Sequence, residues 1–527
     1  MLRGFATRIL TILVLASLLV WTGCGGLSST AQKNINTNTN TNIVSLPGAI
    51  PQNYWGLIIH SLNSFPLQVQ YGQARGWDWA GGQWPDIETC SAQSNLPDDP
   101  CFTWTHLDMA LSDLHQAGVN DILYTLSRTP LWAVDLTSDP TGLGGTDCNY
   151  YQGQARYKAP GQCLIPTDVQ PDGSGSDLMW KNWVGAIAAH VNDATYLQNH
   201  AHIKYWEPWN EFDRSTTLLG NSGQESFEGT YAQLVRLTED LRCIVTGKGT
   251  IHNYPVAGQS TPCTTTPIDP SALIVTPSTG ATTDNLNLMQ NFLYCNGTGS
   301  HAPLPHSNCN TGSAGSQAID VINYHLYANV VTPERVVNSF IPNGRAILQP
   351  TEQNKPLING EGSWGNISAP KVIWTDPYAR AGLVPRLFAL YWSAGVAMNF
   401  WYAYDNIGSS GLVDGSTNQL NQPQASAWIQ TYNWLAGATP ANQPFCSSAG
   451  TVYTCPFTEA SGVQAELVWD SQYQQNCSQM AQPIICGATQ YATPARYNKD
   501  WVDVEGISHA ATATVTIGAN PILLESQ

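Results

Sequence analysis

Charged residues are scarce in this sequence, and basic residues are scarcer than acidic ones. Asp, Glu, Lys and Arg make up 11% of its 527 residues, and 38 acidic residues against 21 basic ones give a formal net charge of −17. A nucleic-acid partner needs a basic surface to meet its phosphates, so this balance argues against one. Trp, Tyr, Asn, Thr and Gly are plentiful, which is typical of a secreted protein that binds uncharged polar ligands such as sugars.

The spacings of common metal-binding motifs are missing as well. The sequence contains no Cys-x-x-Cys and no His-x-x-x-His, so we expect neither a metal nor another cofactor. Setting Cys24 aside leaves twelve cysteines, an even number, and most have a close neighbour in the chain. This pattern indicates disulfides formed in an oxidising compartment. The predicted pairs are Cys90/Cys101, Cys148/Cys163, Cys243/Cys263, Cys295/Cys309, Cys446/Cys455 and Cys477/Cys486.

The N-terminus lacks a hydrophobic run long enough to cross a membrane comfortably. Arg3 and Arg8 precede a short apolar run from Ile9 to Val20, which is the pattern of an export signal. The segment Trp21-Thr22-Gly23-Cys24 then resembles the lipobox of bacterial lipoproteins, in which the cysteine is lipidated. This resemblance implies a signal peptide at 1–24 and a lipid anchor on Cys24 at the bacterial cell surface. Ordinary cleavage and secretion is the alternative.

Two carboxylates stand at the ends of apolar runs. The run from Ile203 to Trp209 has the pattern of a buried strand and is followed at once by Asn210-Glu211. Glu361 repeats this arrangement 150 positions later, after a short run that begins at Pro356. Glycoside hydrolysis needs two such groups, because one protonates the leaving oxygen while the other attacks the sugar or activates water. The pair therefore indicates a glycosidase.

At these residues the sequence resembles clan A of the glycoside hydrolases, and it is most similar to family 39, the β-xylosidase and α-L-iduronidase group. The resemblance implies a (β/α)8 barrel with Glu211 as the acid/base after strand 4 and Glu361 as the nucleophile after strand 7. It also implies a retaining mechanism, for which the two carboxyl groups should lie about 5–5.5 Å apart. One departure is plain, because Phe212 stands where the clan usually has proline.

The rest of the chain fits a barrel followed by a smaller module. Residues 25–49 are rich in Ser, Thr and Asn and predict a flexible tether, followed by a catalytic barrel at 50–435 and a β-sandwich at 436–527. The Gly- and Pro-rich stretch 137–177 predicts an insertion at the rim of the barrel. Expected barrel strands lie at 54–60, 73–78, 119–126, 203–209, 272–276, 319–327, 356–361 and 396–402, helices at 104–117, 180–191 and 231–243, and sandwich strands at 464–469, 501–504, 513–517 and 521–524.

Other residues near strand ends are candidates for sugar binding. Arg75 would keep the nucleophile ionised, or else form a structural ion pair. His325 and Tyr327 share one strand face and match the clan's strand 6, where an aromatic hydroxyl contacts the nucleophile. Trp401 would form the floor of the sugar site, or else belong to the core. The remaining candidates are His60, whose alternative role is structural, Asn210 as partner of the sugar 2-hydroxyl, and Trp364.

The retaining mechanism adds expectations about the strand that carries Glu211. Glu211 must arrive protonated, so we expect burial near Glu361 to raise its pKa. Asn210 and Glu211 would point to opposite faces of a regular strand, so the chain must leave β geometry there. Glu207 would be a buried support residue, and its use as the acid is the less favoured alternative.

The favoured activity is that of a β-xylosidase-like exo-glycosidase acting on plant or microbial carbohydrate. An endo-acting β-glycanase and a non-catalytic carbohydrate-binding barrel are the alternatives, since a fold does not imply a function. Two carboxylates at the expected places disfavour the non-catalytic alternative. The sequence indicates no oligomeric state.

Replacing Cys24 with Ser should release the protein from the membrane or mislocalise it, because two acyl chains suffice for stable attachment. Fractionation of expressing cells followed by immunoblotting measures this. Ser28→Ala, a change in the tether, is the matched control and should stay in the membrane fraction. Recovery of the wild-type protein from the medium, with a mature N-terminus elsewhere, would contradict the lipid anchor.

Overall fold

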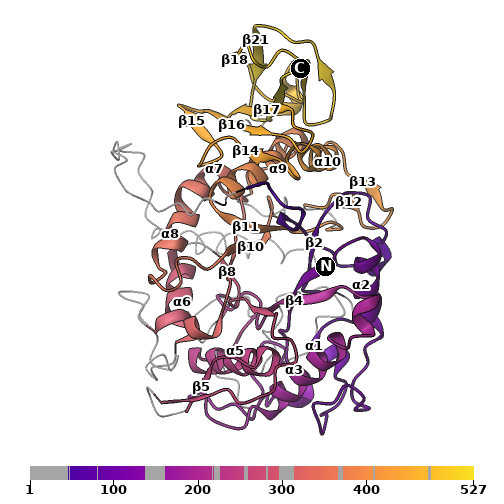
Figure 1. Ribbon diagram of the computed structural model, residues 1–527, viewed down its shortest axis with the longest axis vertical. Coiled ribbons are helices and arrows are strands. Elements are labelled where there is room, and N and C mark those ends of the chain that lie inside the picture. The colour runs from indigo at the N-terminus through magenta and orange to yellow at the C-terminus, as the bar shows by residue number, and fades with distance from the viewer. Residues whose placement is uncertain are drawn as a thin grey trace, which may run out of the picture. The chain divides into compact units, whose positions relative to one another are not determined.

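Parallel strands form a closed barrel in the computed structural model (Figure 1). The sheet order is β7-β4-β3-β2-β1-β11-β10-β9-β8. β7 pairs with β4, β8 pairs with β9, and Val275 bridges to Val321, so β7 and β8 are the two ends of one strand that closes an eight-stranded barrel. The predicted (β/α)8 barrel is therefore confirmed. The strands are β1 (Trp55–Ile58), β2 (Gln73–Gly76), β3 (Asp121–Thr125), β4 (His202–Glu207), β7 (Leu273–Ile274), β8 (Thr279–Gly280), β9 (Ile322–His325), β10 (Leu357–Gly362) and β11 (Val396–Trp401).

The structure describes residues 46, 48–79, 81–136, 161–215, 218, 226–253, 259–280, 283–295, 314–365, 372–406, 410–472 and 476–527. The predicted signal peptide, the lipidation site Cys24, nearly all of the tether and most of the 137–177 insertion lie outside these residues. No helix among the described residues combines the length and the apolar character needed to cross a membrane.

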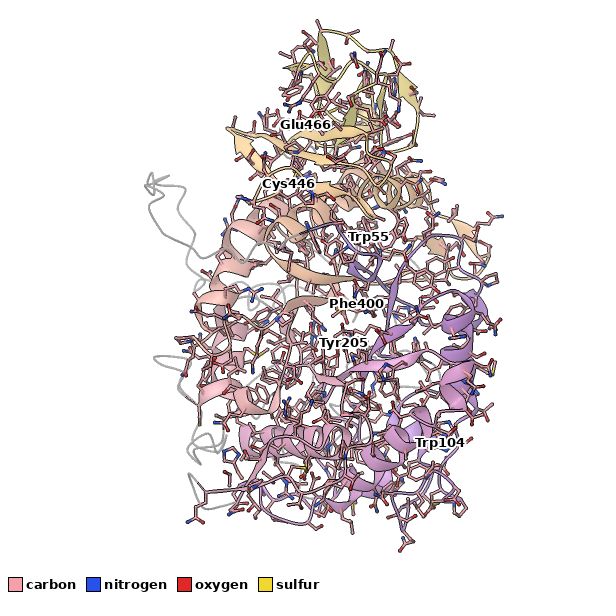
Figure 2. All side chains as sticks on the ribbon, viewed as in Figure 1. Trp55, Trp104, Tyr205, Phe400, Cys446 and Glu466 are labelled. Carbon is pink, nitrogen blue, oxygen red and sulfur yellow. A yellow bond between two sulfur atoms is a disulfide. The ribbon has the colours of Figure 1, made fainter. Side chains whose placement is uncertain are left out.

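Side chains alternate between the barrel interior and the layer beneath the helices, because successive strand residues point to opposite faces. The buried interior cluster consists of Ile58, Leu123, Val275, Val321, Ile358, Met398, Phe400 and Ala403. Gly56 of β1 lies against the ring of Phe400, which is labelled in Figure 2, and a Cβ at this glycine would come within 2.4 Å of the ring. Glycine therefore lets β1 and β11 pack closely, and the filled interior fixes the strands whose carboxyl ends carry the site.

Helices surround the barrel and follow every strand except the first. Residues 59–72, between β1 and β2, contain only a short 3-10 helix at Leu62–Ser64. Helix α5 shows how the sequence sets such bounds, because Thr230 forms a capping box with Gln233 at its start and Gly247 takes the left-handed conformation at its end. The helices are α1 (Trp84–Ile87), α2 (Thr105–Gln116), α3 (Leu178–Val191), α5 (Tyr231–Thr246), α6 (Thr283–Tyr294), α7 (Pro333–Arg335), α8 (Ile341–Ala346), α9 (Pro377–Ser393) and α10 (Gln424–Leu435). The three predicted helices are confirmed within three residues at each end.

The C-terminal part, orange to yellow in Figure 1, is built of antiparallel strands, as expected for a β-sandwich. It joins the barrel through buried polar contacts: Trp469 donates to Glu334 at 2.9 Å, and Arg386 donates to the Ala519 carbonyl at 3.3 Å. The boundary between 435 and 436 stays a prediction. One sheet contains β14 (Thr439–Pro440), β15 (Ser447–Ala449), β16 (Val452–Thr458), β17 (Gln464–Asp470), β19 (Trp501–Val502), β20 (Ser508–His509) and β22 (Ile522–Glu525), and β18 (Thr489–Ala492) pairs with β21 (Thr514–Ile517).

Four of the predicted disulfides are present: Cys90–Cys101, Cys243–Cys263, Cys446–Cys455 and Cys477–Cys486. Cys163 and Cys295 are disulfide-bonded too, and their predicted partners Cys148 and Cys309 lie outside the described residues. Disulfides persist in oxidising compartments, which agrees with export.

Removing the Cys243–Cys263 bridge should destabilise the protein more than removing Cys446–Cys455, because the two bridges span 20 and 9 residues. In the chain-entropy account the longer loop gains more freedom in the unfolded state, and a lost disulfide costs about 2–5 kcal/mol. Urea denaturation of the two Cys→Ala double variants measures the loss. Equal free energies of unfolding for wild type and both variants would show that the bridges do not stabilise the fold.

Candidate active site

The residues after β4 leave strand geometry where the sequence requires it. Glu211 has a φ of 47°, in the left-handed region that non-glycine residues rarely adopt. Its backbone N–H donates to Ser278 Oγ at 3.0 Å, which holds this turn against the neighbouring strand. Asn210 and Glu211 are therefore both directed to the carboxyl end of the barrel, and the predicted departure from β geometry is confirmed.

Glu361 lies near the end of β10, opposite His325 on the parallel neighbour β9. One carboxylate oxygen of Glu211, one of Glu361 and a ring nitrogen of His325 all lie within 4.8 Å of one another. Tyr327 donates its hydroxyl to Glu361 at 2.6 Å, as the resemblance to clan A implied. The structure thus brings the two predicted carboxylates together with His325 and Tyr327.

Arg75 of β2 connects these groups beneath the site. Its side chain is 0% exposed, and it donates to Glu207 at 2.8 Å, to Glu361 at 3.0 Å and to Asn210 Oδ1 at 2.7 Å. Glu207 also accepts hydrogen bonds from Thr125 and Asn323, so both of its oxygens have donors. The contacts of Glu207 are those of the expected buried support residue.

The pKa of Glu211 moves in the direction opposite to the prediction. Burial raises it, but Arg214, whose Nε lies 2.5 Å from Oε2, and His325, whose Nδ1 lies 3.0 Å from Oε1, outweigh burial and lower it. For Glu361 burial prevails and, together with the Glu211 charge, raises the pKa, although His325, Arg75 and Tyr327 oppose the rise. The expectation of a raised pKa is wrong for Glu211 in the free site because it omitted Arg214.

His60 stands at the wall of the site after β1. Its Nδ1 lies 3.0 Å from Asp405, its Nε2 lies 3.5 Å from Asp78, and its ring meets the Tyr402 ring edge-on at 5.2 Å between centroids. Tyr402 also lies near Tyr327, at 6.4 Å between ring centroids. An aromatic and acidic wall therefore stands beside Tyr327, which contacts Glu361.

The structure contradicts the placement of Trp401 as the floor of the sugar site. Trp401 is fully buried, donates its indole N–H to the Ser410 carbonyl at 2.9 Å and packs against Trp428 of α10. Its side chain belongs to the helix layer, so the alternative core role holds. Trp364 is also fully buried, with its ring 4.9 Å from that of Trp401. Strand parity explains the error, because Tyr402, one residue on, points to the side of the site.

Sequence reasoning missed Arg214, Asp405, Tyr402 and Asp78. Arg214 stands three residues after Glu211, a spacing at which a charged side chain in a turn reaches back to its neighbour. Asp405 follows the last barrel strand, where the carboxyl ends of (β/α)8 strands carry functional groups. These positions were therefore visible in the sequence, whereas their pairing with particular partners was not.

Among the described residues, Glu211, His325 and Glu361 form the one trio of His, Cys or acidic side chains close enough together to hold a metal ion. Arginine side chains already pair with the two carboxylates, because Arg75 contacts Glu361 and Arg214 contacts Glu211. A cation would have to compete with both guanidinium groups. The chemistry of this donor set fits an acid and nucleophile pair better than a metal centre.

Comparison with known proteins agrees with this architecture. Neither a protein-family model nor a curated relative matches the sequence. A family 39 glycoside hydrolase from the gut symbiont Bacteroides cellulosilyticus WH2 matches with a TM-score of 0.56 and 13% identity, over 90% of this chain and 81% of that one. A glucosidase from Croceicoccus marinus matches with a TM-score of 0.55 and 12% identity, over 92% and 98%. At these identities the likeness shows the shared fold, a (β/α)8 barrel.

Replacing Arg75 with Met should lower the free energy of unfolding by about 3–5 kcal/mol, because Glu207 and Glu361 would be left as buried, uncompensated charges. The loss should be largest near neutral pH. It should shrink as pH falls, since removal of the guanidinium raises the pKa of the Glu361 carboxyl in the folded state and its protonation then relieves part of the cost.

Urea denaturation between pH 4 and pH 8 measures this effect. Arg345→Met is the matched control, because Arg345 donates to backbone carbonyls only in the contacts at Gln353, Lys355 and Gly395. Its cost should not vary with pH in this way. An Arg75→Met loss that is small or independent of pH would show that Arg75 does not hold the carboxylates.

Proposed function

We propose that this protein is a retaining glycoside hydrolase. The observation that carries the proposal is the approach of Glu211 and Glu361, which have carboxylate oxygens within 4.8 Å of each other. Retaining enzymes place their two carboxyl groups about 5–5.5 Å apart, whereas inverting enzymes keep about 6.5–9.5 Å to admit a water. The shared fold with a family 39 glycoside hydrolase and a glucosidase supports the same conclusion.

The reaction begins with Glu211 as acid and Glu361 as nucleophile. Glu361 attacks the anomeric carbon while Glu211 gives its proton to the leaving oxygen, so one C–O bond forms as the other breaks. Water then attacks the same carbon, Glu211 takes the water proton, and the bond to Glu361 breaks. Arg75 and Tyr327 stabilise the carboxylate of Glu361 whenever it is released.

Asn210 is oriented for a contact with the sugar. Arg75 donates to its Oδ1 at 2.7 Å, which leaves the amide nitrogen as the donor toward the site. In the proposed complex this nitrogen donates to the 2-hydroxyl, a hydrogen bond that strengthens in the transition state. His60, held by Asp405, and Tyr402 complete the sugar-binding wall.

Within this class we propose exo action of the β-xylosidase type, on short chains of plant or microbial carbohydrate. One structural neighbour is described as a glucosidase and another as a family 39 glycoside hydrolase, and both descriptions support a glycoside as the substrate. An endo-acting β-glycanase is the second candidate. Aryl β-xyloside and β-glucoside hydrolysis without cleavage of polymeric xylan or glucan would favour exo action, and the reverse would favour the endo enzyme.

We also propose that the enzyme is exported and held at the cell surface by lipid on Cys24. The disulfides support export, because such bonds persist outside the reducing cytoplasm.

The two glutamates should give opposite stereochemistry when their variants are rescued by azide. In Glu361→Ala no covalent intermediate forms, so azide attacks the vacated face and yields the glycosyl azide of inverted configuration. In Glu211→Ala a dinitrophenyl glycoside still forms the intermediate, because its leaving group needs little protonation. Azide then yields the product of retained configuration. NMR of the products reads both outcomes.

Glu239→Ala is the matched control, because Glu239 is a buried carboxylate of α5 that contacts His252 outside the site. It should leave the configuration of the wild-type product unchanged. Full activity in Glu211→Ala or Glu361→Ala, or an exchange of the two outcomes, would overturn the assigned roles. Absence of any hydrolysis by the wild type, across a panel of aryl glycosides and plant polysaccharides, would overturn the glycosidase.

A further inference from the structure

We propose that Arg214 is a positioning residue that keeps Glu211 unprotonated in the free site and moves away when the leaving group of the substrate enters. The inference rests on the proposed glycosidase activity, in which Glu211 acts first as an acid and then as a base. Arg214 would couple the change between these two states to occupation of the site.

Contacts at Glu211 show why the acid form and the Arg214 contact exclude each other. Arg214 Nε, which carries one hydrogen at all pH values of interest, lies 2.5 Å from Oε2. His325 Nδ1 lies 3.0 Å from the other oxygen, Oε1. A proton on Oε2 would meet the Nε–H group of Arg214, so Glu211 is set to accept hydrogen bonds and not to donate one. The first chemical step needs the donor form.

The two arginines of the site differ in how firmly they are held. Arg75 is 0% exposed and fixed by Glu207, Glu361 and Asn210. The side chain of Arg214 is 33% exposed and extends from the turn after β4. An ion pair at this exposure is screened by water and is weaker than a buried one. An entering leaving group would therefore displace Arg214 while Arg75 stays in place.

Once Arg214 has moved, burial and the acidic neighbours of Glu211 favour its protonation, whereas the contact with His325 and the charge of Arg75 continue to oppose it. Burial opposes the carboxylate, and the negative charge of Glu361 lies close by on β10. Asp213 adds a second acidic neighbour, and burial together with the Glu211 charge raises the pKa of Asp213 to about 6. Among the described residues, the charged and titratable groups that face Glu211 are Arg214 and Asp213 of the same turn, His325 of β9, Tyr327 after β9, Glu361 of β10 and Arg75 of β2.

Protons balance over one turnover. Substrate binding displaces Arg214, and Glu211 takes up one proton from solvent. That proton passes to the leaving oxygen as the bond from this oxygen to the anomeric carbon breaks and the bond from Glu361 forms. Arg214 returns to the ionised Glu211 until the attacking water delivers its proton there and the bond to Glu361 breaks. Release of the sugar restores the Arg214 contact and returns the proton to solvent.

The pH dependence of turnover tests this role, because kcat/KM reports ionisations of the free enzyme and kcat those of the complex. The probe is the phenyl glycoside of whichever sugar the wild type hydrolyses in the substrate panel, since its poor leaving group needs the acid. The alkaline limb of kcat should lie above that of kcat/KM by about 1–3 pH units, the usual effect of a nearby opposite charge. In Arg214→Met the alkaline limb of kcat/KM should move to higher pH until it coincides with the alkaline limb of kcat.

Matched variants separate charge from structure. Arg214→Lys keeps the positive charge and should restore the gap between the limbs, and Arg214→Gln is a second neutral variant expected to behave like Arg214→Met. Arg496→Met removes an exposed arginine that pairs with Glu466 in the C-terminal part, and it should move neither limb. Thermal unfolding checks that each variant is folded.

The outcomes distinguish this inference from the proposed function. An active wild type whose two alkaline limbs coincide, or neutral Arg214 variants whose kcat/KM limb does not move, would overturn the role of Arg214 and leave the glycosidase intact. A wild type that hydrolyses nothing in the panel would instead overturn the proposed function on which this role depends.

Discussion

The buried guanidinium of Arg75 is the interaction on which the rest of the site depends. From its place on β2, Arg75 contacts Glu207 of β4, Asn210 just after β4, and Glu361 of β10. Neither the arginine nor the two carboxylates would tolerate burial alone, because an unpaired charge in a protein interior is costly. The placement of the proposed nucleophile and the joining of these strands therefore depend on the same buried guanidinium.

The two glutamates are supported in different ways, and each way suits a different chemical task. Glu361 lies on a strand and is held by the fully buried Arg75 and the partly buried Tyr327. Glu211 lies on a turn with a left-handed backbone, and one of its partners is the partly exposed Arg214. A nucleophile needs a fixed position, whereas an acid/base gains and loses protons in the course of each turnover. The fold provides a rigid support for the first and an adjustable one for the second.

The sequence allowed the barrel to be predicted because its strands are short apolar runs that end in polar residues. It also placed Glu211, Glu361, Arg75, His325 and Tyr327, since each follows or ends such a run. It failed at Trp401, where a shift of one residue exchanges the two faces of a strand and the aromatic residue that faces the site is Tyr402. It failed again on the pKa of Glu211, because composition and spacing do not reveal that Arg214 folds back onto the carboxylate.

The site is assembled from segments that lie far apart in the chain. Arg75 and Glu361 are separated by 286 residues, and His60 and Asp405 by 345. Contacts of this kind form late in folding, because the chain must first close long loops. A nascent chain that has emerged through β10 already contains both glutamates, yet it lacks β11, which closes the sheet against β1, and Asp405, which holds His60. Catalytic competence would therefore arise only when the last strand enters the barrel, so enzyme activity would act as a reporter of complete closure during refolding or synthesis.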